Sequence, residues 1–308
     1  MGEVVDGSPE AAALREIVPG VYAWVQPDGS WWVNNAGVIT GDDGTVIVDT
    51  CATEQRTRRF LDAVPGPVRI AVSTHHHGDH TYGNSLLPDE TVIIAHEATR
   101  AVQLTDPIID GCPPFWSPRP DWGRVSRRPA DLVFRTDLTV FTGRRRVDLI
   151  HPGFTAHTVG DVVAWLPEER VLFSGDLLFH GLTPLVFMGS LDGALRSLDW
   201  IADFEPAHVV PGHGPLIAAG PLPGVLAAHE RYYRLVLEAA KDGLRDGLGP
   251  LEAARRTDLG EFGGWADAER LVLNLHRAYA DAGGAEMDLV AALTDAMTWN
   301  GGPLATSV

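Results

Sequence analysis

The feature that most constrains this chain is a cluster of ligand-type side chains at residues 73–80, Ser-Thr-His-His-His-Gly-Asp-His, directly after a short apolar segment. The apolar segment predicts a buried strand. Side chains alternate along extended backbone, so His75 and His77 are expected to project to the same side. Gly78 would permit a tight turn that brings back Asp79 and His80. The H-x-H-x-D-H pattern fits one crowded metal or two adjacent metals, and the alternative is a surface cluster that binds metal only adventitiously.

Short β-type segments separated by Gly- and Pro-rich turns surround this cluster. Strands are predicted over 20–25, 31–39, 45–49, 69–73, 91–95, 132–134, 138–141, 147–150, 162–166, 171–173 and 207–210. The spacing of the first three predicts an antiparallel meander, and residues 1–16 are expected to be a loose lead-in with a short helix. Helices are predicted over 53–64 and 191–204.

The chain changes character near residue 220, where strand patterns stop. Helical periodicity then runs over 222–246, 250–257, 265–281 and 286–298, broken at Gly and Pro. We therefore expect a first domain over residues 1–220 and an all-helical extension over residues 221–308. The extension can pack on the core, close a pocket or form a homodimer contact, and the sequence leaves these three roles open.

Three more strand ends carry ligand-type residues bounded by Gly or Pro, namely His157, Asp176 and His213. If these strands lie in adjoining sheets, their ends can converge on one crevice. The count then suits two metals, with Asp176 as a carboxylate able to bridge both. One metal would have His75, His77 and His157, and the other would have Asp79, His80 and His213.

The order and context of these motifs resemble the metallo-β-lactamase-fold hydrolase superfamily. The resemblance runs over about residues 17–218 and includes Ala-His-Thr at 156–158, Ser-Gly-Asp at 174–176 and Pro-Gly-His-Gly at 211–214. It implies an α+β protein, an αβ/βα sandwich with the metals at one edge and the same ligand set, with Asp176 bridging. In this family a bridging aspartate is typical of hydroxyacylglutathione hydrolases, thioesterases and lactonases, whereas true β-lactamases generally lack it.

The donor set also predicts the chemistry. Imidazole and carboxylate ligands without a thiolate suit two zinc ions, and they suit iron or manganese as well. Two such ions would provide a hydroxide at neutral pH and polarise a substrate carbonyl, while Asp79 would orient the nucleophile or take its proton. We expect a hydrolase that cleaves a thioester or lactone of a fairly apolar small molecule. The alternatives are a di-iron redox enzyme, a β-lactamase-type amide hydrolase and a non-catalytic metal-binding module.

Residues around the cluster give weaker predictions. Segment 105–130 is rich in Pro and aromatic residues, so we expect either an ordered flap beside the substrate pocket or a loop that packs its aromatics on the core. If the segment is a flap, three aromatic residues and a later histidine are expected to bind the substrate: Phe115, Trp116, Trp122 and His180. We expect Asp49 and Asn84 to support the ligands by hydrogen bonding, although a turn or helix-start carboxylate fits Asp49 equally well and a loop residue without a role fits His180.

Composition narrows the partners and the compartment. The formal net charge of −17 argues against a nucleic-acid partner, because phosphate binding needs a basic surface. Two cysteines, Cys51 and Cys112, cannot form a disulfide framework, which favours the reducing cytoplasm. Residues 1–16 contain no apolar secretory core, and no stretch is long and apolar enough to span a membrane. The expected partner is a small acyl substrate.

Overall fold

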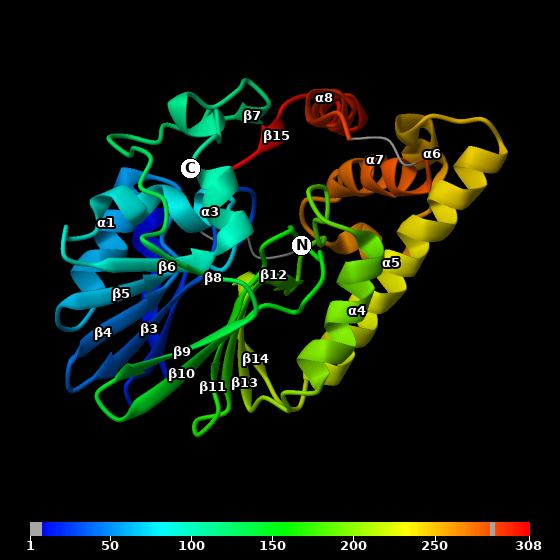
Figure 1. The fold of residues 1–308 in the computed structure, drawn as a ribbon. Helices are drawn as coiled ribbons and strands as arrows, with labels where there is room; N and C mark the ends of the chain where they lie inside the picture. The colour runs from blue at the N-terminus through cyan, green and yellow to red at the C-terminus, as the bar shows by residue number, and fades with distance from the viewer. Residues whose placement is uncertain (1–7, 284–286) are drawn as a thin grey trace.

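Two β-sheets packed face to face form the centre of the computed structural model, which describes residues 8–283 and 287–308 (Figure 1). The first sheet has the order β1-β2-β3-β4-β5-β6-β8, and the second has the order β14-β13-β12-β11-β10-β9. The first contains β1 (Ala13–Val18), β2 (Val21–Val25), β3 (Ala36–Gly41), β4 (Gly44–Val48), β5 (Val68–Val72), β6 (Val92–His96) and β8 (Leu132–Phe134). The second contains β9 (Asp137–Thr142), β10 (Arg145–Ile150), β11 (Val163–Leu166), β12 (Val171–Phe179), β13 (His208–His213) and β14 (Ile217–Ala218).

The core between the sheets is built from β-branched and aromatic side chains, such as Val46, Val147 and Phe173. Strand β12 is buried along all of its residues, including Ser174 and Asp176 in the middle of its otherwise apolar sequence. The sheets are joined at one edge by Asn35, whose Nδ2 donates to the carbonyls of Pro211 and Gly214. These bonds therefore hold the two sheets together at this edge.

Helices cover both outer faces of the sheet pair. On the first sheet lies α1 (Glu54–Ala63), whose Phe60 contacts Trp24 with ring centroids 5.7 Å apart; α3 (Glu97–Gln103) directly follows β6. The second sheet is covered by α4 (Leu191–Ala202) and α5 (Leu222–Arg245) (Figure 1). The arrangement confirms the predicted αβ/βα sandwich.

The helical extension consists of α5, α6 (Pro250–Arg256), α7 (Arg270–Gly283) and α8 (Leu289–Asn300). It shares one hydrophobic core with the second sheet, in which Leu178 packs together with Tyr232 and Leu271. The change from strands to helices falls between β14 and α5, although the shared core joins the two parts, so the boundary at residue 220 remains a prediction. In the described part of the chain, no helix is long and apolar enough to cross a membrane.

Several predicted segments differ from the structure. Strands β12 and β13 continue to Phe179 and His213, past their predicted ends at residues 173 and 210, so Asp176 lies inside a strand and not at its end. The lead-in contains a short 3₁₀ turn at Pro9–Ala11 and then β1, which pairs with β2; residues 1–7 lie outside the described residues. Residues 31–35 precede β3 instead of belonging to it, because buried polar side chains bond this irregular backbone, as Gln26 does at the Asn34 carbonyl. Helix α7 begins at Arg270 instead of residue 265, because residues 265–267 pair with the segment after β12 through a Thr183-to-Ala266 backbone bond.

Candidate metal centre

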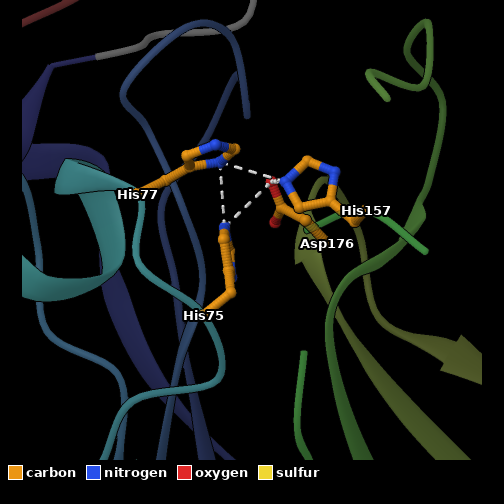
Figure 2. A group of neighbouring side chains, drawn as sticks. All are labelled: His75, His77, His157 and Asp176. Atoms are coloured by element: carbon orange, nitrogen blue, oxygen red, sulfur yellow. Dashed lines mark hydrogen bonds and ion pairs between the residues drawn. The ribbon is translucent and has the colours of Figure 1, made fainter. Parts of the chain in front are cut away.

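Three imidazoles and a carboxylate from both sheets meet at the joined edge (Figure 2). His75 and His77 follow β5, His157 precedes β11, and Asp176 lies within β12. Nε2 of His75 and Nε2 of His157 lie 3.1 Å and 3.0 Å from Nδ1 of His77. Oδ2 of Asp176 lies 3.8 Å and 3.4 Å from Nε2 of His75 and His157. We call the place enclosed by the three rings the first position.

A second group lies on the other side of Asp176 and consists of Asp79, His80 and His213. Nε2 of His213 lies 3.2 Å from Oδ2 of Asp79 and 3.5 Å from Oδ2 of Asp176. Nε2 of His80 lies 3.1 Å from Oδ1 of Asp176. We call this the second position. The structure thus brings all seven predicted metal ligands together, with the Asp176 carboxylate between the two positions.

Hydrogen bonds on the outer side of four of the five ligand rings fix which nitrogen of those rings faces inward. The outer Nδ1 atoms of four rings lie within hydrogen-bond distance of acceptors: the Thr74 hydroxyl for His75 (3.0 Å), the Asp49 carboxylate for His80 (2.8 Å), the Leu185 carbonyl for His157 (2.7 Å) and the Gly29 carbonyl for His213 (2.9 Å). A neutral imidazole that donates from Nδ1 has a lone pair on Nε2. Four lone pairs therefore point into the site, as metal ligation requires.

The charges of the site favour a cation. Burial alone would lower the pKa of His80, but the carboxylates of Asp176, Asp49 and Asp79 raise it well above its usual value. Burial alone would raise the pKa of Asp176, but His213, His80 and His157 hold it well below the usual range. These opposite shifts show that ionised carboxylates create a negative potential where the lone pairs converge.

The donor set and two buried atoms fit a pair of divalent cations. Nε2 of His80 and Oδ1 of Asp176 are buried and lie 3.1 Å apart, and neither has a hydrogen-bond partner elsewhere among the described residues. A buried polar atom without a partner is costly, and a cation between these two atoms would satisfy both. Imidazole and carboxylate donors without sulfur are compatible with zinc, iron and manganese.

Gly78 has a different role from the one predicted. It begins a helical turn, α2 (Gly78–Thr81), instead of a tight turn. A Cβ atom built on Gly78 would lie 2.2 Å from the ring of Tyr82, so the glycine makes room for that side chain. The helical turn itself carries Asp79 and His80 toward the second position.

Of the two residues predicted to support the ligands, Asp49 contacts one directly. It directly follows β4 and has a φ of +64°. Its carboxylate accepts from the Thr74 backbone N–H at 2.7 Å and the Thr74 hydroxyl at 2.8 Å, besides its contact with His80. The Asn84 side chain bonds to the hydroxyls of Ser73 and Thr50, and Thr50 in turn donates to the His80 carbonyl. Asn84 therefore supports the backbone behind the ligands.

The residues predicted to bind substrate have mixed surroundings. Trp116 and Trp122 are only 4% and 6% exposed and pack on Trp32, with ring centroids 5.1 Å and 4.8 Å apart. Phe115 is half-buried beside Trp116. Nδ1 of His180 lies 2.9 Å from the carbonyl of Pro215. These four roles remain predictions, and substrate contact by the two tryptophans would require the aromatic cluster to open.

The structure also explains how segment 105–130 is held. It contains a 3₁₀ turn at Ile108–Asp110 and strand β7 (Trp116–Ser117), which pairs in parallel with β15 (Leu304–Ala305) near the C-terminus (Figure 1). The buried rings and this pairing match a loop packed on the core, and they leave open whether part of the segment also borders the substrate pocket.

Several site residues were not found by sequence reasoning because they act through backbone atoms or packing. Leu185 and Gly29 contribute carbonyl oxygens to ligand rings, and the identity of a side chain gives no signal for that. Gly29 has a φ of +68°, and a Cβ there would meet the Gly214 backbone N at 2.7 Å. The ring of Phe187 stacks on His77, with ring centroids 5.3 Å apart.

Comparisons with known proteins agree with this geometry. Residues 29–213 match the family model described as the metallo-beta-lactamase superfamily. The 2,4-dinitroanisole O-demethylase subunit alpha of Nocardioides sp. (strain JS1661) is 30% identical over 54% of this chain and 51% of its own length. The hydroxyacylglutathione hydrolase of Synechococcus sp. (strain JA-3-3Ab) is 31% identical over 52% of this chain and 54% of its own length. The chain thus spans about half the length of these curated relatives.

Solved structures share the fold at low sequence identity. The match with a metallo-beta-lactamase from Pontibacter korlensis covers 72% of this chain and 99% of the lactamase chain, with a TM-score of 0.59 and 19% identity. A stereoselective inverting sec-alkylsulfatase from Pseudomonas sp. covers 91% of this chain, which covers 51% of it, with a TM-score of 0.69 and 18% identity. A match over 91% of the chain has to include most of the helical extension.

Proposed function

The chain belongs to the metallo-beta-lactamase superfamily, whose members are generally hydrolases, and we propose that it is a hydrolase that uses two zinc ions at the first and second positions. One observation carries the proposal: four histidine rings are held with their Nε2 lone pairs directed at a buried aspartate that lies between two ligand groups. When bound, the ions would activate a water molecule as nucleophile and polarise the bond to be cleaved.

The chain's own residues would hold and direct the reacting groups. His75, His77 and His157 would bind the first ion, and the second group would bind the other, with Asp176 between them. Asp79 lies against His213 within the second group. In the proposal it orients the nucleophile and accepts its proton, because it is an ionisable oxygen at the place where the attacking group would lie.

The open side of the site supports an apolar substrate. His77 is the one half-buried ligand, while the other six ligands are buried. Its ring stacks on Phe187, and Met188, the next residue in the sequence after Phe187, is 38% exposed. We propose that a small acyl substrate enters on this side and that its apolar part contacts these two side chains.

A thioester or lactone is the proposed substrate class. Asp176 lies between both ligand groups, and a bridging aspartate is the feature by which the sequence resembles thioesterases, lactonases and hydroxyacylglutathione hydrolases. The 31% identity with a hydroxyacylglutathione hydrolase supports the same class. Cys51 and Cys112 are buried and unpaired, which is compatible with the proposed cytoplasmic location.

A second candidate is hydrolysis of a sulfate ester or an aryl ether. The structural match that includes most of the helical extension is with a sec-alkylsulfatase, and a relative at 30% identity is named as an O-demethylase subunit. This candidate uses the same two metal ions, but the activated water attacks an atom other than an acyl carbon.

The test combines metal analysis with a substrate panel. Protein purified without added metal is expected to contain about two zinc ions per chain and to hydrolyse thioesters or lactones faster than alkyl sulfates, nitroaryl methyl ethers and β-lactams. Preference for a sulfate or an ether would select the second candidate. About two iron ions with charge-transfer absorption would favour redox chemistry instead. A folded protein that takes up no metal would contradict the proposal.

A further inference from the structure

The segment between β12 and α4 is bonded along its length to the helical extension. A β-bridge joins Leu182 to Ala266, and the Thr183 backbone N–H donates to the Ala266 carbonyl at 3.0 Å. Nη1 of Arg270 donates to the Thr183 carbonyl, also at 3.0 Å. Residues 182–187, which we call the strap, therefore follow a path that is set by α7 and the residues just before it.

Asn274 on α7 makes the central attachment. Its Nδ2 donates to the Pro184 carbonyl at 2.8 Å, and its Oδ1 accepts from the Val186 backbone N–H at 2.8 Å. A third bond joins Nδ2 to the hydroxyl of Tyr232 on α5 at 3.0 Å. Asn274 is fully buried. The two strap bonds lie on either side of Leu185, so one side chain fixes the orientation of that residue's backbone.

The strap in turn supports two ligands of the first position. The Leu185 carbonyl accepts from Nδ1 of His157 at 2.7 Å, which keeps Nε2 of that ring free to bind a cation. The Phe187 ring stacks on His77 with an interplanar angle of 18°. Leu185 and Phe187, which make these two contacts, are each next in the sequence to a residue that Asn274 bonds.

We propose that Asn274 is a positioning residue for the first position: through the strap, it holds the His157 ring in the orientation and tautomer that bind a cation. The inference rests on the proposed function, in which the site binds two metal ions. It gives the helical extension a role in assembling the site, besides the packing, pocket closure and dimer contact that the sequence leaves open.

The decisive variant is Asn274→Leu, which keeps the shape and removes both strap bonds. Loss of a residue that orients a metal ligand typically weakens binding by roughly 10–100-fold. Stepwise chelation of the cobalt-loaded protein should therefore release one ion roughly 10–100-fold more readily than in the wild type, with the other ion unchanged and an altered visible spectrum.

Tyr232→Phe is the matched control, because it removes the third bond of Asn274 and leaves both strap bonds in place. Its chelation curve should follow that of the wild type. If Asn274→Leu does not fold, Asn274→Asp replaces it, since this variant keeps the shape and the acceptor for Val186 but loses the amide donor to Pro184. Folding of each variant is checked by circular dichroism and by denaturant unfolding without metal.

A readout without metal separates this inference from the proposed function. In the metal-free wild type, the His157 Nδ1 proton should be visible by NMR as a hydrogen-bonded, slowly exchanging signal. In the Asn274 variant, it should exchange faster. A folded variant that keeps this signal and releases both ions as the wild type does would overturn the positioning role, as would equal weakening of both ions. Wild-type protein that shows the signal but binds no cation would contradict only the proposed function.

Discussion

The first and second positions are supported by different parts of the molecule. At the second position, His80 is oriented by a buried carboxylate, Asp49, which directly follows β4 of the first sheet. At the first position, His157 is oriented by the Leu185 carbonyl of the strap, which the helical extension holds. Residues of the sandwich thus orient His80 at the second position, whereas the orientation of His157 at the first position also depends on residues far along the chain.

The chemistry of the two supports also differs. A carboxylate that accepts from an imidazole makes a charge-assisted hydrogen bond, which is stronger than a bond to a neutral carbonyl. It also raises the basicity of the ligand ring. Asp49 further accepts two bonds from Thr74, so its orientation is fixed independently of His80. We therefore expect the second position to bind its cation more tightly and the first to be lost first during chelation.

The largest expected effect comes from the residue that both positions share. Asp176→Asn removes the negative charge between the two groups while keeping the side-chain shape. Both cations should be weakened together, and hydrolysis should fall by more than the roughly 10–100-fold typical of residues that only orient ligands. Metal content after dialysis and kcat measure this. Retention of two ions with full turnover in the folded variant would show that Asp176 does not bridge the positions.

Asp49→Asn should affect the second position more than the first. Asparagine tolerates the left-handed backbone at this residue, so the change tests the charge and not the turn. We expect the second ion to bind roughly 10–100-fold more weakly, and the first ion, which Asp49 supports only through Thr74 and His75, to weaken less. Stepwise chelation would then reverse the order of release relative to Asn274→Leu. The same order of release in both variants would remove the distinction between the two supports.

The extension also supports the second position indirectly, through a histidine that must stay neutral. Nε2 of His229 on α5 accepts from the backbone N–H of Phe179, whose ring stacks on His213, and Nδ1 donates to the Val225 carbonyl. Burial lowers the pKa of His229 to about 4. The unfolded chain, with a histidine pKa near 6.5, therefore takes up a proton between pH 6.5 and pH 4 that the folded protein does not bind.

Acidification through this window should reduce the free energy of unfolding. The contribution of His229 is present above about pH 6.5 and lost by about pH 4, and it amounts to about 3 kcal/mol. His229→Gln keeps an acceptor for Phe179 and does not titrate, so its unfolding free energy should depend less on pH over this range. Denaturant unfolding of both metal-free proteins from pH 7 to pH 4 measures the difference. If the unfolding free energies of the two proteins fall in parallel with pH, His229 is not the group that titrates in this window.

The smallest expected effect lies at a different contact of α7. Nε2 of His276 pairs with Asp295 of α8 at 2.8 Å, and both side chains are partly exposed. Asp295→Asn should cost no more than about 1 kcal/mol of stability, because partly exposed ion pairs contribute little. Neither cation should be affected. A change in metal release would show that general loosening of α7 disturbs the site, which would weaken the specific role of Asn274.

Much of the fold could be predicted because local patterns and tertiary pairing agree. The helix at 54–63 and the strands at 68–72 and 92–96 match the predicted segments within one residue at each end. The pattern failed where tertiary contacts decide, as for Trp31 and Trp32, which read as a strand but lie in an irregular turn held by buried aromatic packing. Strand propensity describes side chains suited to a half-buried surface, and these two meet that need without a ladder.

The sequence by itself determined which residues can bind cations, because His, Asp and Gly at these spacings bring their own chemistry and local backbone to the ends of strands. It also determined the change from strands to helices near residue 220, since the hydrophobic period changes there. Only the tertiary structure decided which nitrogen of each ring faces inward. That choice depends on carbonyls such as those of Leu185 and Gly29 and on the distant side chain of Asn274. Backbone acceptors are the same in every residue, so their positions become known only when the chain has folded around the site.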